Sequence, residues 1–378
     1  MKRILTFLLV LTAGTALSAQ EFKWSGYFNS GLGIVASDTG GTPYLRAYGL
    51  DAGQNGLRLR LNGEWANAGG DAGFKVRLQA QAVHPNNGYG YFSLPYAYGW
   101  VKALNGIFTF SGGIVDDATW DTGGIVLTWT TGADQGEGLG ALVKISPLAG
   151  LDIGFGAYAN SIQGGGANNV LALPFNTPLD LDDVKYTFNL GFTLPEVLRL
   201  NATFRTANAA GGTGTSSRVL TGLKVLAVPN LTAILEAEIN NLDDFGNAGL
   251  IGIYETLGYK TGSLNFGLNA AEYISQAAGA DFSVELDPWV SYAFGGIVPQ
   301  VDIVYFFGGA WNPDAYGRYI YANRNDAAQD VLSIRPSVKF NIGSVFVELG
   351  DVLYFNNIFT DGADTLYNVF YVDFKWSF

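Results

Sequence analysis

The sequence predicts an all-β chain that closes into a transmembrane, antiparallel up-and-down β-barrel with long extracellular loops and short periplasmic turns. Three observations predict this fold. Apolar and polar residues alternate at period two along most of the chain, short turn sequences alternate with long loops, and the last strand ends on an aromatic residue. Because strand side chains point alternately to two faces, each such segment has one apolar face for lipid and one polar face for a lumen.

The first residues have the organisation of a secretory signal peptide. Lys2 and Arg3 precede a short apolar core over residues 4–11, and small residues follow up to Ala19. This core is too short to span a bilayer, and no second long apolar run occurs in the sequence. We therefore expect residues 1–19 to be a signal peptide and residues 20–378 to form one barrel domain. The expected location is the outer membrane of a diderm bacterium, reached through the periplasm.

Composition restricts the classes of function. The chain has 51 Gly, 14% aromatic and 14% charged residues, and no Cys. Glycine suits twisted strands and tight turns, and the lack of cysteine excludes disulfides and thiol chemistry. The formal net charge is −12, and removing Lys2 and Arg3 with the signal lowers it by two to −14. This acidic balance argues against nucleic acid as a partner, and no cofactor is implied.

The period-two alternation locates the individual strands. In 57–65, Leu57, Leu59, Leu61, Gly63 and Trp65 interleave with Arg58, Arg60, Asn62 and Glu64, and the pattern recurs in 74–81, 198–205 and 332–340. We expect about 18 strands, with roughly 16 as the alternative. Their predicted starts lie near residues 22, 56, 73, 96, 107, 138, 151, 184, 197, 218, 231, 249, 263, 282, 298, 331, 344 and 366. An apolar stretch at 124–130 is either an extra strand or part of a loop, and 270–280 is assigned to a loop.

The connections differ in length and chemistry. Short ones contain Gly, Pro and Asn, the residues that favour tight turns, at 67–70, 147–150, 195–196, 229–230, 260–263 and 341–344. Long ones are rich in acids, Gly and Asn, at 38–55, 116–137, 160–183, 207–217 and 309–329. Short turns on one side and long loops on the other are typical of a membrane barrel.

The C-terminal strand carries a specific pattern. Apolar residues occupy every second position up to the terminus, at Phe370, Val372, Phe374, Trp376 and Phe378. This stretch resembles the C-terminal assembly signal of Gram-negative outer-membrane proteins, which has a terminal Phe and apolar residues at alternate positions. The resemblance implies recognition by the barrel-assembly machinery and a barrel surrounded by outer-membrane lipid.

Charged residues suggest a functional wall. Arg58, Arg60, Lys75 and Arg77 lie on the predicted inward faces of two strands joined by a short turn, so we expect them together on the lumen wall. The loop at 116–137, which is the third connection on the long-loop side and which we call the third long loop, carries Asp116, Asp117 and Asp121. The arrangement resembles the porin superfamily, in which the third loop folds into the barrel and its acids face a basic ladder on the wall. The alternative is ordinary wall charge paired with nearby acids such as Glu64.

The porin resemblance implies a passive diffusion channel for small hydrophilic solutes and ions, with a charged constriction and association into homotrimers. Rings of fixed charge bias ion selectivity in such channels. The alternative is a narrow or plugged barrel that acts as a surface adhesin or structural protein, with the long loops as its working part. We do not expect an enzyme, because His84 is the only histidine and has no recognisable partner motif.

Overall fold

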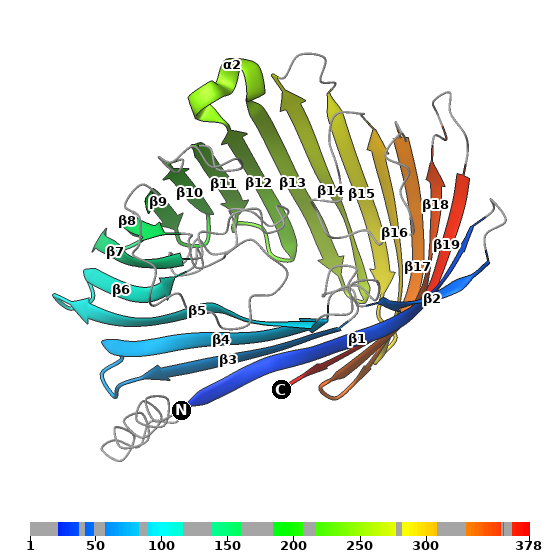
Figure 1. The fold of residues 1–378 in the computed structure, drawn as a ribbon, viewed down its shortest axis with the longest axis horizontal. Coiled ribbons are helices and arrows are strands. Elements are labelled where there is room, and N and C mark those ends of the chain that lie inside the picture. The colour runs from blue at the N-terminus through cyan, green and yellow to red at the C-terminus, as the bar shows by residue number, and fades with distance from the viewer. Residues whose placement is uncertain are drawn as a thin grey trace.

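The chain closes into an antiparallel β-barrel (Figure 1). The computed structural model describes residues 22–37, 42–48, 57–82, 90–115, 138–159, 184–206, 217–276, 282–307, 330–356, 358 and 365–378. Its strands are β1 (Lys23–Ser37), β2 (Tyr44–Tyr48), β3 (Leu57–Ala66), β4 (Ala72–Ala82), β5 (Gly90–Ala103), β6 (Phe108–Val115), β7 (Gly138–Leu148), β8 (Leu151–Ala159), β9 (Val184–Leu194), β10 (Leu198–Arg205), β11 (Arg218–Val225), β12 (Leu231–Asn240), β13 (Leu250–Thr261), β14 (Leu264–Ser275), β15 (Ser283–Tyr292), β16 (Ile297–Phe307), β17 (Asp330–Ile342), β18 (Val345–Asn356) and β19 (Thr365–Ser377).

These strands occupy 18 positions around the barrel. β2 and β3 share one position, because β2 pairs with β1 over Gly31–Val35 and β3 pairs with β1 over Lys23–Ser30. Every other neighbour along the wall is the next strand in the chain. The prediction of an up-and-down barrel of about 18 strands is confirmed.

The first and last strands close the barrel. β1 and β19 pair in register from Tyr27 opposite Ser377 to Ser37 opposite Tyr367. Gly26 N donates to the Phe378 carbonyl at 2.9 Å, and Phe378 N donates to the Gly26 carbonyl at 3.1 Å. Closure satisfies the backbone groups that an open sheet edge would leave exposed.

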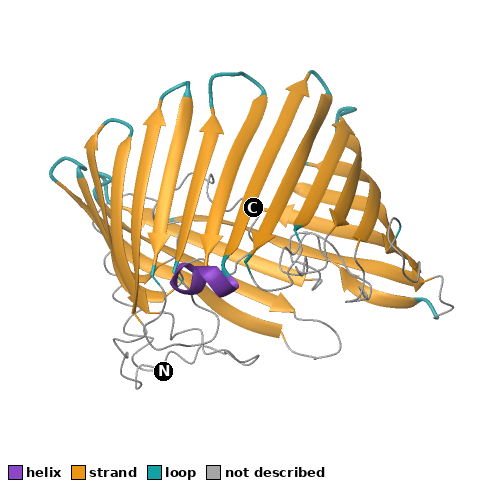
Figure 2. Ribbon diagram, turned by 90° about the horizontal axis from the view of Figure 1, so that it is seen from above, coloured by secondary structure: helices purple, strands orange, loops and turns teal. Residues whose placement is uncertain are grey.

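The two rims differ as the sequence predicts. Short turns connect β3 to β4, β7 to β8 and β17 to β18, and Figure 2 shows such turns along one rim. At the opposite rim, a short 3₁₀ helix, η6 (Leu242–Asp244), and α2 (Phe245–Ala248) connect β12 to β13. Among the described residues, no helix has the length and apolar character needed to cross a membrane.

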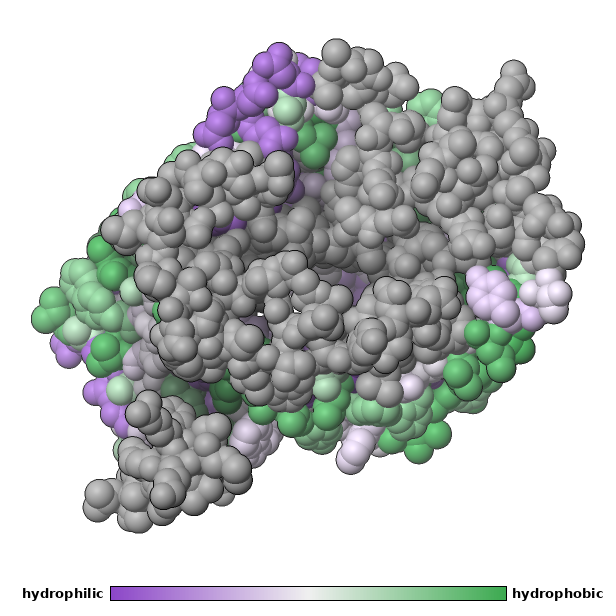
Figure 3. Space-filling model, in the orientation of Figure 1, coloured by the Kyte–Doolittle hydropathy of each residue, from purple (hydrophilic) through white to green (hydrophobic). Residues whose placement is uncertain are grey.

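The wall has an apolar outer face and a polar inner face. On β9, Phe188 and Leu190 are 47% and 51% exposed, whereas the alternating Thr187 and Asn189 are 0% and 6% exposed. Figure 3 shows apolar side chains on parts of the outer surface and hydrophilic ones at α2. Exposed leucine and phenylalanine at every second position is the arrangement expected of a wall in contact with lipid.

The predicted strand starts agree with the structure to within one residue, with one exception. β5 begins at Gly90, six residues before the predicted start. The strand runs through Pro95, which cannot donate to a sheet ladder, because a register shift opposite Arg77–Gln79 accommodates the proline within the strand.

Some further predictions need correction or remain open. The assignment of 270–280 to a loop is wrong in part, because β14 continues to Ser275 and pairs with β13 along its whole length. β2 was not predicted as a separate strand. The segment 124–130 and the predicted signal peptide lie outside the described residues.

Candidate functional site on the lumen wall

The four cations singled out in the sequence share the inner face of β3 and β4. The register pairs Arg58 with Gln81, Arg60 with Gln79, Asn62 with Arg77 and Glu64 with Lys75. Opposite residues in an antiparallel pair project to the same side of the sheet. The interleaved residues, including Leu59 and Val76, lie on the outer side. The short turn therefore brings Arg58, Arg60, Lys75 and Arg77 together, which we call the basic wall.

Neutral groups hold the two central guanidinium groups of the basic wall. Arg60 donates from Nε and one Nη to Gln79 Oε1 at 2.9 and 2.7 Å. Arg77 donates from Nε to Asn62 Oδ1 at 2.7 Å. An amide oxygen satisfies and orients a guanidinium without cancelling its charge. Arg60 and Arg77 therefore retain a positive potential toward the lumen.

Tyrosine rings complete the surroundings of the basic wall. The Arg60 guanidinium lies 5.5 Å from the centre of the Tyr27 ring, and that of Arg77 lies 4.6 Å from the Tyr96 ring. Lys375 approaches the same Tyr27 ring at 4.7 Å. Cation–π contacts restrict the side chains while adding no negative charge. Tyr27 and Lys375 come from the first and last strands, so barrel closure completes this cluster.

Lys75 differs from its neighbours because it has a carboxylate partner. Its Nζ lies 3.6 Å from Glu64 Oε1, and both side chains are well exposed, at 39% and 51%. Solvent screens such a pair, so it contributes little to stability. The sequence left open the alternative that the wall cations simply pair with nearby acids such as Glu64. Among the described contacts of the four cations, this alternative applies to Lys75.

The acids that face the basic wall belong to the opposite side of the barrel. β12 lies nine positions from β3 in the ring of 18, so the two strands are diametrically opposed. Glu236 and Glu238 on β12, and Glu285 and Asp287 on β15, all lie on the inner face and are no more than 5% exposed. We call β12–β15 the acidic wall. The sequence carries a usable signal for it, because both pairs of acids alternate with apolar residues.

The cationic and acidic sides meet at β11 and β12. Arg218 Nη1 donates to Glu238 Oε1 at 3.3 Å, and Tyr254 OH donates to Glu238 Oε2 at 3.2 Å. Arg205 lies directly opposite Arg218 in the register, and Lys224 follows on the same face. Cations therefore continue along the inner face from β9 to β11, as they do on β3 and β4.

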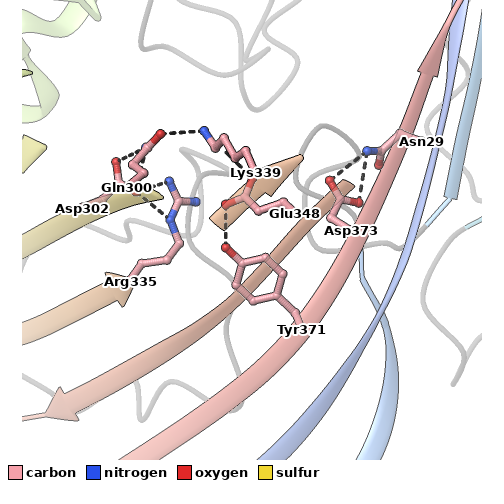
Figure 4. Close-up of polar contacts among 8 residues, drawn as sticks. All are labelled: Asn29, Gln300, Asp302, Arg335, Lys339, Glu348, Tyr371 and Asp373. Carbon is pink, nitrogen blue, oxygen red and sulfur yellow. Dashed lines mark hydrogen bonds and ion pairs between the residues drawn. The ribbon is translucent and has the colours of Figure 1, made fainter. Parts of the chain in front are cut away.

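A polar network links the inner faces of β16 and β17 (Figure 4). Arg335 donates from Nε and Nη2 to Asp302 Oδ2 at 3.0 and 2.8 Å. Gln300 donates its amide to both oxygens of Asp302 at 2.7 and 2.9 Å, and Lys339 Nζ donates to Gln300 Oε1 at 2.6 Å. The cation and carboxylate cancel here, in contrast to the basic wall.

The network continues across the closing strands (Figure 4). Lys339 Nζ lies 4.0 Å from Glu348 Oε2, and Tyr371 OH donates to Glu348 Oε1 at 2.8 Å. Asn29 on β1 donates from Nδ2 to both oxygens of Asp373 on β19, at 3.2 and 3.1 Å. These contacts, together with those of Asp302 and Arg335, form what we call the seam network. It joins five consecutive positions of the wall.

Several predicted site residues lie outside the described residues. These are Asp116, Asp117 and Asp121 of the third long loop, and their placement relative to the basic wall stays a prediction. His84, for which we expect no catalytic role, also lies outside the described residues. Within the described ranges, no group of three His, Cys, Asp or Glu side chains is arranged to hold a metal ion.

The C-terminal strand shows the predicted alternation. Phe370, Val372, Phe374, Trp376 and Phe378 are 36–49% exposed on the outer face, whereas the interleaved Tyr371 and Asp373 are at most 1% exposed. The last strand therefore has an apolar outer face and a buried inner face. Its role as an assembly signal stays a prediction.

Comparison with known proteins supports the fold. No protein-family model matches the chain, and no curated protein matches its sequence. Among solved structures, the chain is similar to Pseudomonas aeruginosa OccK11 (OpdR), with 9% identity, a TM-score of 0.53 and coverage of 94% of this chain and 96% of that one. It is also similar to P. aeruginosa OpdL, with 11% identity, a TM-score of 0.52 and coverage of 94% and 99%.

A mutant of the Rh. blastica porin matches with 13% identity, a TM-score of 0.49 and coverage of 95% of this chain and all of that one. At these identities, the likeness concerns the fold. The register, the apolar outer face and the two Pseudomonas structures together show that this chain folds as an 18-stranded β-barrel of the porin type.

Proposed function

We propose that the chain is an outer-membrane porin of a diderm bacterium, through which small hydrophilic solutes and ions diffuse passively. The observation that carries the proposal is the division of the inner wall into a basic wall on β3 and β4 and an acidic wall on β12–β15. Opposed fixed charges in a low-dielectric shell create a field across the lumen. That field would align solutes with separated charges and bias ion passage.

The chemistry of the basic wall supports a role in solute selection. Arg60 and Arg77 are oriented by Gln79, Asn62 and tyrosine rings, so their charge remains available to a passing anion or carboxylate. The guanidinium fork is suited to bidentate contact with such groups. Asp116, Asp117 and Asp121 stay part of the proposal as a second source of negative charge from the third loop.

Planar-bilayer recording of the purified full chain tests the proposal. We expect stable, ohmic conductance steps from the natural sequence. The double variant Arg60→Gln/Arg77→Gln should shift the reversal potential in a salt gradient toward cation preference. The control variant Lys102→Gln/Lys260→Gln removes the same charge from exposed positions near the short-turn rim, at the ends of β5 and β13. An equal shift from both variants would reject the basic wall as the selective element.

A narrow or plugged barrel is the second candidate function. It is favoured by the burial of inner-face residues, since Tyr273 and Glu285 are each 1% exposed. In that case, the barrel would act as a surface adhesin or structural protein. No conductance at any voltage, from protein whose folding is verified, would favour it over the channel.

The proposal includes the partners implied by the barrel. The outer face would contact outer-membrane lipid, and the C-terminal strand would be recognised by the barrel-assembly machinery during insertion. Association into homotrimers is part of the proposal, and size-exclusion chromatography with light scattering on the detergent-solubilised chain tests it.

A further inference from the structure

Two acidic residues interrupt the largely apolar outer face of the barrel. All lysines and arginines whose side chains the structure describes are on the inner side by register, and most outward strand positions are apolar or small. On β13 and β14, two outward positions carry carboxylates, Glu255 and Glu272.

The register fixes the direction of Glu255. Tyr254 is 2% exposed and bonds to Glu238 inside the barrel, whereas Leu257 is 53% exposed on the outside. Glu255 shares the face of Leu257, is itself exposed, and stands sixth of the 12 residues of β13. Its cross-strand neighbours are Leu235 and Ala270. The carboxylate therefore lies near mid-height of the wall.

Glu272 lies diagonally across Ala270 from Glu255. It pairs with Ile253 on β13 and Val284 on β15, and it shares the outer face with Ile274, which is 39% exposed. Diagonal neighbours on one face are about 7–8 Å apart, close enough for the two carboxylates to repel each other. Ala270 between them is only 5% exposed.

These two carboxylates differ from the other mid-strand acid on the outer face. Asp351 on β18 accepts a hydrogen bond from Asn368 Nδ2 at 2.9 Å, so the wall itself supplies its donor. In the part of the chain that the structure describes, neither Glu255 nor Glu272 has an ion-pair partner. An ionised group facing hydrocarbon is costly and usually marks a functional contact.

The surface beside the glutamates suits close approach by another protein. Outward residues Ala202, Thr221 and Ala237 form a row across β10–β12 that continues through Ile253 to Glu272. The Thr221 hydroxyl donates to the Asn201 carbonyl, so the row presents no free donor. Small side chains let neighbouring elements pack closely inside membranes.

We infer that the outer face of β12–β14 is a docking surface for another outer-membrane protein that presents an arginine or lysine among apolar side chains. Charge complementarity sets the chemistry of this partner, because Glu255 at mid-height and Glu272 closer to the end of β14 need cationic or other hydrogen-bond donors. A second copy of this chain does not fit. Its described lysines and arginines face the lumen, and its own docking surface would add two more carboxylates.

The lack of cysteine in the sequence allows a direct test. Leu257→Cys places one thiol beside Glu255, and Leu32→Cys on β1 is a matched control at a similarly exposed outward position, 61% against 53%. Each full-length variant is labelled with benzophenone maleimide in intact outer membranes and irradiated. We expect one discrete heterologous cross-link at position 257 and none above background at position 32.

Charge dependence distinguishes docking from chance proximity. In the Leu257→Cys background, Glu255→Gln/Glu272→Gln should reduce the cross-linked product about tenfold, the factor expected from losing one good polar contact in a membrane. The cross-linked peptide should derive from a lipid-facing segment with Arg or Lys. Exchange of that residue for Glu should abolish the product, and Glu255→Lys should restore it.

Three results would overturn the inference. They are a cross-link to this chain itself, equal products at positions 257 and 32, and a product that survives both glutamine substitutions. Folding of every variant is verified by the heat-dependent electrophoretic mobility of the barrel, so a lost cross-link cannot reflect misassembly. Conductance is recorded in parallel, because failure of docking with normal conductance would leave the proposed channel intact.

Discussion

The basic wall and the seam network use similar residues in different ways. Arg60 and Arg77 are held by neutral amides and tyrosine rings, whereas Arg335 is held by Asp302. The first arrangement keeps a net charge on the inner wall, and the second removes it. The partner therefore decides whether an inward arginine keeps its charge toward the lumen or joins strands together.

Position in the barrel accounts for this division. The seam network spans β16 to β19 and β1, where the last strand of the chain pairs with the first to close the ring. Contacts between Asn29 and Asp373 join residues that are 344 positions apart in the sequence. Hydrogen bonds to charged groups contribute more than neutral ones. A network of them at the closing strands stabilises the pairing that has the largest loop-closure cost.

The largest expected effect comes from breaking the seam network. Arg335→Met leaves Asp302, whose side chain is only 9% exposed, without its cation. Loss of one partner of a buried ion pair costs about 3 kcal/mol or more. Arg60→Met removes the hydrogen bonds to the neutral Gln79 amide but leaves no buried charge unpaired, so it should cost less, about 1.5–3 kcal/mol. Urea titration of both variants in lipid vesicles, followed by tryptophan fluorescence, measures the difference. Equal destabilisation would contradict the distinction between the two regions.

A glycine beneath Tyr371 offers a smaller change in the same network. A Cβ at Gly350 would collide with the Tyr371 ring and hydroxyl, which bonds to Glu348. Gly350→Ala should therefore displace the ring and destabilise the barrel by about 1–3 kcal/mol, as overpacking does. Gly112→Ala on β6 is the control, since its nearest contact would be 3.9 Å away. Its expected effect is within about 0.5 kcal/mol.

The comparison of Gly350→Ala with Gly112→Ala can also give the opposite result. If both substitutions cost the same, the Tyr371–Glu348 hydrogen bond contributes nothing beyond strand propensity. Tyr371→Phe in the Gly350→Ala background separates the two contributions, because the hydroxyl can be lost only once. We expect Tyr371→Phe to destabilise the Gly350→Ala variant by less than it destabilises the natural sequence.

Local sequence patterns were sufficient for one wall and insufficient for the other. Alternation and a short turn predict that Arg60 and Arg77 share a face, because these residues are close in sequence. Their partner Tyr27 follows only from the pairing of β1 with β3. The acids opposite them, Glu236 and Glu238, are about half the chain away. Only the strand count, and hence the circumference of the barrel, places those acids across the lumen.

The charged residues on the outer face also could not be predicted from local sequence patterns. Glu272 lies in the segment assigned to a loop, where a carboxylate is ordinary. The pairing of β13 with β14 turns the same residue into a charge on a lipid-facing wall. The seam network likewise depends on closure, because its partners come from strands at both ends of the sequence. Patterns of period two give the face of each residue and leave its neighbours around the ring undefined.

The smallest expected effect on stability concerns the exposed ion pair of the basic wall. Glu64→Gln removes the partner of Lys75, and exposed pairs contribute about 0–1 kcal/mol, so the urea midpoint should barely change. Glu64→Gln also leaves one more uncompensated cation on the basic wall. The substitution should therefore shift the reversal potential toward anion preference, opposite in sign to the shift expected from Arg60→Gln/Arg77→Gln. Because salt screens exposed charges within about 10 Å at 0.1 M, the shift should shrink as ionic strength rises. A shift toward cations, or one independent of salt, would mean that the charge at this wall does not act on ions in the lumen.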